Sequence, residues 1–104
     1  MICAEFYTEP KGEIVGFKIS GHNGKAGSDI ICAAVSSAAY MAVNTITDII
    51  QADAQVTVED GYMLITVSSE KAKACRIIFA GLKLHLLGLE EQYPKNIHVC
   101  YMEV

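Results

Sequence analysis

The dipeptide Asp60-Gly61 stands between two short segments in which apolar and polar residues alternate. Both of its residues tolerate positive φ, which a two-residue turn between antiparallel strands requires. If Glu59 lies opposite Tyr62, the apolar residues of the two segments face each other: Val58 with Met63, Val56 with Ile65 and Ala54 with Val67. The sequence therefore predicts a β-hairpin here, and the rest of the chain must fold around it.

Two further segments favour extended structure near the N-terminus. Residues 2–8 and 13–20 are separated by EPKG, which has the proline and glycine of a hairpin loop. Pairing Thr8 with Glu13 gives a second apolar face: Phe6 with Val15, Ala4 with Phe17 and Ile2 with Ile19. The C-terminal segment IHVCYMEV alternates as well and predicts a fifth strand.

Two segments have apolar residues at the three- and four-residue spacing of a helix with one buried face. The first runs from residue 30 to about residue 51, with Ser28 or Asp29 as the expected N-cap and with a defined stripe: Ile31, Val35, Ala38, Ala42, Ile46 and Ile49. The second follows an N-cap at Ser68 or Ser69 and precedes Gly88 and Pro94, with its own stripe: Ala72, Cys75, Ile78, Phe79, Leu82 and Leu86. The order ββαββαβ predicts an α+β fold, a largely antiparallel sheet with two helices packed on it.

Composition limits the classes of protein that this chain can be. Its 104 residues are 52% hydrophobic and fit one domain, residues 1–104. A net charge of −4 argues against direct nucleic-acid binding and suits a basic protein partner. Unbroken apolar runs such as 30–35 are shorter than the roughly 20 residues that span a bilayer, and a signal-peptide pattern is missing, so we expect a soluble cytoplasmic protein with no membrane contact. Four cysteines without C-x-x-C spacing predict reduced thiols and no metal site.

The segment GHNGKAGSDIICAAVSS, residues 21–37, joins a glycine-rich loop to the start of the first helix. Cys32 falls in the first turn, where unpaired backbone amides and the helix dipole favour a thiolate. Nine intervening residues allow His22 to fold back to the sulfur, and the same amides would stabilise an oxyanion. Ser36, one turn later, shares the face of Cys32 and is a supporting candidate, although its hydroxyl also suits a hydrogen bond to its own helix.

Other interpretations of these residues stay open. A cysteine also serves as a small hydrophobic residue in a core. A phosphate-binding loop with Lys25 at the helix start is a further reading, although two residues separate Gly21 from Gly24 and Ala26 follows the lysine, which departs from the Walker A spacing. The cysteines and histidines elsewhere are interpreted as structural residues: Cys3, Cys75, Cys100, His85 and His98.

The residues SGH at 20–22, the loop that follows and SDIICAAVS at 28–36 resemble the signature of the ribosomal-processing cysteine protease family, Prp. Chain length and element order resemble the family too, whereas Asn23 departs from the alanine that more often follows the histidine. The resemblance implies an endopeptidase that removes the N-terminal extension of a large-subunit ribosomal protein, cutting after an aromatic residue. It also implies homodimers and a mechanism without a cofactor.

By position, the resemblance implies that His22 is the general base and Cys32 the nucleophile, and that Asp29 caps the helix or orients the site. We expect a flexible loop that peptide binding would order, because its residues are small or solvated: Gly21, Asn23, Gly24, Lys25, Ala26, Gly27 and Ser28. The alternative function is a non-enzymatic ribosome-assembly factor that binds a ribosomal protein through a sheet edge or a helix.

Overall fold

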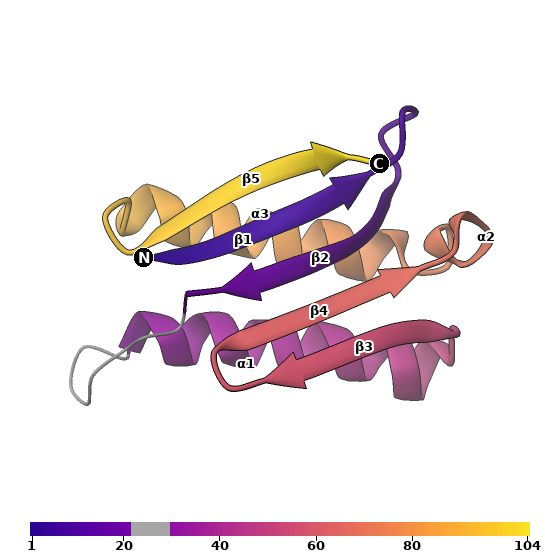
Figure 1. The fold of residues 1–104 in the computed structure, drawn as a ribbon, viewed down its shortest axis with the longest axis horizontal. Helices are drawn as coiled ribbons and strands as arrows, with labels where there is room; N and C mark the ends of the chain where they lie inside the picture. The colour runs from indigo at the N-terminus through magenta and orange to yellow at the C-terminus, as the bar shows by residue number, and fades with distance from the viewer. Residues whose placement is uncertain (22–29) are drawn as a thin grey trace.

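Five strands form one sheet in the order β3-β4-β2-β1-β5, and the long helices lie behind one of its faces in Figure 1. The structure is a computed structural model that describes residues 1–21 and 30–104. Its strands are β1 (Ile2–Thr8), β2 (Ile14–Ser20), β3 (Ala54–Glu59), β4 (Tyr62–Val67) and β5 (Ile97–Glu103). Its helices are α1 (Ile30–Asn44), η1 (Thr45–Ile50), α2 (Ser69–Ala72) and α3 (Arg76–Gln92). The α+β class and the order ββαββαβ are confirmed, and β1 and β5 form the sheet's parallel pair.

The hairpin of β3 and β4 has the predicted register, from Glu59 opposite Tyr62 to Ala54 opposite Val67. Of the two turn residues only Gly61 has the left-handed backbone, with φ 72°, whereas Asp60 was expected to share it and does not. On the apolar face of the hairpin, the side chains of β4 are buried, whereas those of β3 are largely exposed, because β3 is an edge strand of the sheet. Val58 on β3 is 44% exposed, whereas Met63 opposite to it is 5% exposed.

The predicted register of the β1–β2 hairpin is wrong by two residues. Phe6 lies opposite Phe17 rather than Val15, because the loop covers residues 9–13 and a β-bulge follows Tyr7. The backbone N–H of Glu9 closes the loop by donating to the carbonyl of Glu13 at 2.9 Å. A shift of two residues keeps every side chain on its own face of the sheet, so the predicted apolar face survives.

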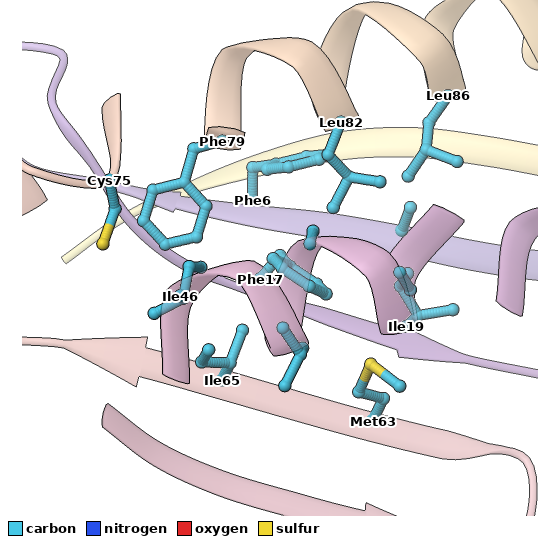
Figure 2. Packing of buried hydrophobic residues seen from close by; sticks show 14 of the residues in the cluster. Phe6, Phe17, Ile19, Ile46, Met63, Ile65, Cys75, Phe79, Leu82 and Leu86 are labelled. Atoms are coloured by element: carbon cyan, nitrogen blue, oxygen red, sulfur yellow. The ribbon is translucent and has the colours of Figure 1, made fainter. Parts of the chain in front are cut away.

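The core lies between the sheet and the helices. Figure 2 shows Phe79, Leu82 and Leu86 extending from α3 toward the strands. The Phe17 ring meets the Phe79 ring edge to face at a centroid distance of 6.2 Å, and it lies 5.9 Å from the Phe6 ring. Each such aromatic pair stabilises a fold by about 0.5–1.5 kcal/mol beyond the stabilisation that comes from burial alone.

The first helix covers the predicted range but ends differently. After α1 the chain continues as the π-helical segment η1, and Gln51 ends it in a left-handed conformation with φ 59°. A π-helix has more residues per turn, so the buried face rotates. Ile49 was expected to be buried but is 77% exposed, and Ile50 packs against the core instead.

The combined helix Ile30–Ile50 is also long and apolar enough to span a membrane, with a mean hydropathy of 1.5. Counting only unbroken apolar runs in the sequence did not reveal this property. Core helices of water-soluble proteins meet the same criterion, and one side of this helix is buried in the core through Val35, Ala39, Ala42, Val43 and Ile46.

The second predicted helix is divided in two. Ser68 caps the short α2, its side chain accepting from the Lys71 backbone N–H at 3.3 Å. The helical path then breaks before α3, which passes through Gly88 and ends ahead of Pro94. The break places Cys75 in the core with no exposed surface. The other residues of the stripe predicted for this helix are buried too, except Ile78, which is half-buried.

We predict that Gly16→Ala destabilises the sheet. A Cβ there would collide with the Ile65 carbonyl oxygen on β4 and lie 3.2 Å from Thr66 Cγ2, so the strands must separate locally. We expect a loss of about 1–3 kcal/mol in the free energy of unfolding. Gly81→Ala is the control, because nothing lies within 4 Å of its added Cβ and alanine favours a helix by about 1 kcal/mol. Urea unfolding measures both, and an unchanged Gly16→Ala midpoint would contradict the close strand contact.

We predict that Gly21→Ala is more destabilising than Gly12→Ala. Both glycines have positive φ, 86° and 88°, so both substitutions cost about 1–2 kcal/mol in backbone strain. At Gly21 the added Cβ would also collide with the Met1 carbonyl oxygen, whereas at Gly12 nothing lies within 4 Å. Thermal unfolding should show a larger decrease in Tm for Gly21→Ala. Equal decreases would mean that the packing of Gly21 against Met1 contributes nothing to stability.

Candidate active site

Cys32 is the third residue of α1, so the prediction that it lies in the first turn is confirmed. The first four N–H groups of a helix have no acceptor inside it, and the helix dipole adds partial positive charge there. The first turn of α1 contains no acidic side chain to compensate that charge. Cys32 is half-buried, and so it is supported by packing while remaining accessible.

A cleft of about 630 Å³ opens beside Cys32. One wall is α1 from Cys32 to Tyr40, including Ala33 and Ser36, and the other is the β3–β4 turn, residues 58–63. We call this space the Cys32 cleft. Its walls are brought together because Met63 on β4 and Val35 on α1 both belong to the buried core.

Ser36 lines the Cys32 cleft, as its predicted supporting role requires. Gly21 is the last described residue before the predicted loop, and it follows β2 directly. The other predicted site residues lie outside the described residues: His22, Asn23, Gly24, Lys25, Ala26, Gly27, Ser28 and Asp29. The approach of His22 to Cys32, the cap at Ser28 or Asp29 and the mobility of the loop therefore stay predictions.

The other three thiols differ from Cys32 in their surroundings. Cys75 is buried in the core and Cys100 is half-buried on β5, and burial raises the pKa of both thiols. Cys3 was interpreted as a packing residue, which is wrong, because it is exposed. It alternates with the buried Ile2 and Ala4 along β1 and so belongs to the sheet face opposite the core.

A larger cavity, of about 950 Å³, lies between the β1–β2 loop and the α2–α3 region. It contains charged residues such as Glu13 and Arg76, whose 2.8 Å ion pair lowers the pKa of the Glu13 carboxyl. Its lining contains neither cysteine nor histidine. Within residues 1–21 and 30–104, no cluster of three potential metal ligands occurs. Of these two cavities, the Cys32 cleft is the one with a cysteine among its described lining residues.

Sequence analysis missed the second wall of this cleft. Tyr40 and the residues around the β3–β4 turn gave no chemical signal of their own, although the turn itself was predicted from Asp60-Gly61. To predict this wall, one would have to know that α1 packs beside β4. These two segments lie about 30 residues apart in the chain. The nucleophile candidate was a local feature of the sequence, whereas the cleft is a tertiary one.

Comparison with known proteins identifies the family and the fold of this chain. The family model for cysteine protease Prp matches residues 1–98. The ribosomal processing cysteine protease Prp of Staphylococcus aureus is 25% identical over 105 residues, 97% of this chain and 99% of that protein. The crystal structure of Prp from S. aureus with a substrate peptide has a TM-score of 0.88 at 24% identity, covering 98% of this chain and 100% of that one. A crystal structure from Streptococcus mutans has a TM-score of 0.85 at 27% identity and covers 100% of this chain and 99% of the other. The chain therefore belongs to the cysteine protease Prp family.

Proposed function

We propose that this protease removes the N-terminal extension of a large-subunit ribosomal protein and cuts after an aromatic residue. The resemblance of this sequence to the Prp family implies this substrate. The relative from S. aureus is a ribosomal processing protease of nearly the same length. The observation that carries the proposal is the half-buried Cys32 in the first turn of α1, on the wall of a cleft. A cysteine protease needs an accessible thiol beside a groove that can hold a polypeptide.

In the proposed mechanism Cys32 is the nucleophile and His22 the general acid and base. The thiolate attacks the scissile carbonyl carbon, and unpaired N–H groups at the start of α1 stabilise the oxyanion. The imidazolium donates its proton to the departing amine, leaving a thioester on Cys32. His22 then takes a proton from water, which hydrolyses the thioester, so that carboxylic acid and free thiol are released.

The remaining proposals follow partly from the family resemblance and partly from the sequence patterns described above. Asp29 caps α1 or orients the site, and Ser36 supports it from one turn beyond Cys32. The loop that begins at Gly21 closes on bound peptide. The protein acts as a cytoplasmic homodimer without a cofactor, and it contacts its protein substrate rather than nucleic acid.

We predict that Cys32→Ala abolishes cleavage of a peptide that carries an aromatic residue before the scissile bond. Loss of a nucleophile should lower kcat/KM by at least about 10³-fold, and His22→Ala by about 10²–10⁴-fold. Mass spectrometry of the products measures both rates, and Cys3→Ala serves as the control variant on the opposite side of the sheet. Cleavage by Cys32→Ala would contradict the mechanism. A wild-type protein that binds the peptide without cleaving it would instead be the non-enzymatic assembly factor.

We also predict that iodoacetamide at neutral pH alkylates Cys32 before the other thiols. Cys75 and Cys100 should react slowly, because burial raises the pKa of each and limits access. Cys3 is the informative comparison, since it is exposed but lies on a strand without a helix dipole. Peptide mapping measures the four rates. If Cys3 reacts as fast as Cys32, exposure alone explains the reactivity and the helix start does not activate the sulfur.

A further inference from the structure

The described part of the Cys32 cleft lining carries charge of one sign. The charged residues in its lining are Glu59 and Asp60, both at the exposed β3–β4 turn, and the described lining has no lysine, arginine or histidine. Three other carboxylates of the described chain have a basic partner: Glu5 with Lys18 at 3.7 Å, Glu13 with Arg76 at 2.8 Å and Glu90 with His98 at 3.4 Å. Within the described residues, Glu59 and Asp60 form no ion pair. Other exposed carboxylates in the same part of the chain also lack an ion pair, but Glu59 and Asp60 are the ones that line this cleft, so their charge is available to a group that enters it.

Exposed apolar and aromatic groups lie in the same lining. Val58 is 44% exposed and Tyr40 46% exposed, and Tyr62 is half-buried. A small cation would leave these surfaces in water. A lysine or arginine side chain covers apolar surface with its alkyl stem and brings its charge to carboxylates and aromatic faces. The lining therefore suits a basic side chain of a polypeptide better than a free ion.

The length of the cleft limits where that basic side chain can lie. Along α1 the lining extends from Cys32 to Tyr40, which corresponds to about 12 Å of helix. An extended peptide covers this length with about four residues. A residue held by the β3–β4 turn therefore lies within about four positions of a bond attacked by Cys32.

We propose that the β3–β4 turn is a specificity element, in which Glu59 and Asp60 select a lysine or arginine within about four residues of the scissile bond. This inference rests on the proposed function, since it takes Cys32 as the nucleophile. Exposed ion pairs are individually weak, so we expect each carboxylate to contribute about 2- to 5-fold in selectivity. The two residues are specificity residues and take no part in bond making.

The first experiment measures the charge of the cleft without a substrate. Cationic and anionic methanethiosulfonates of similar size modify Cys32 in wild type, in Glu59→Gln/Asp60→Asn, and in the control Asp53→Asn/Glu70→Gln. The control removes the same charge at exposed residues outside the cleft lining. Asp60→Asn preserves the turn, because Asn-Gly also adopts it. Cys3 in each protein is the internal reference.

We expect the ratio of cationic to anionic modification rates at Cys32 to fall by about 4-fold or more in Glu59→Gln/Asp60→Asn. The ratio should stay unchanged in the control and at Cys3. High salt should reduce the wild-type ratio, since the charges are exposed. An equal ratio in wild type and Glu59→Gln/Asp60→Asn would overturn the proposal.

The second experiment measures selection by binding, which separates this inference from the cleavage chemistry. A neutral peptide with one lysine scanned over four positions on each side of the scissile bond is titrated into Cys32→Ala, with and without Glu59→Gln/Asp60→Asn. We expect one position at which lysine tightens Kd by about 4- to 25-fold over glutamine, and loss of that preference in the triple variant. No preferred position would overturn the proposal. Lysine-dependent binding without cleavage by wild type would instead contradict the proposed function, and it would support only the recognition of lysine by the β3–β4 turn.

Discussion

The packing of α1 on the sheet determines where the parts of the candidate site lie. Two alanines on the buried face of α1, Ala39 and Ala42, have almost no exposed surface. Small side chains at these positions let a helix axis approach its neighbour closely. The start of α1 is thereby held beside the β3–β4 turn, and Cys32 lines the space between them. The catalytic proposal and the specificity proposal both depend on this one contact between layers.

Local sequence predicted those parts of the fold that local geometry determines. The β3–β4 register is correct because a two-residue turn at Asp60-Gly61 leaves little choice of pairing. The β1–β2 register is not, since a longer loop and a bulge after Tyr7 allow several pairings with the same apolar face. The burial of Ile50 in place of Ile49 has a similar origin, because apolar spacing carries no sign of a change from α to π geometry.

In the candidate site, too, local sequence predicted the local features and not the tertiary ones. The position of Cys32 in a first turn could be predicted because helix starts have recognisable sequence signals, and the structure confirms it. The wall formed by the β3–β4 turn could not, because no pattern within either segment indicates that they meet. The partnership of Cys32 with His22 was inferred from the reach of the intervening chain and from family resemblance, and it remains a proposal. Sequence thus identified the candidate nucleophile but not the cleft that it lines.

The two carboxylates near Cys32 impose opposing requirements on the cleft. A negative charge beside a thiolate disfavours it, yet the same charge attracts a cationic substrate. Exposure of Glu59 and Asp60 reconciles the two effects, because water and salt screen their interaction with the sulfur. A lysine that binds at the turn pairs with these carboxylates at the wall of the cleft, at the exposed positions where such pairs are individually weak. The two proposals therefore assign separate roles to the two walls: the start of α1 provides the nucleophile, and the exposed turn selects the peptide without taking part in the chemistry.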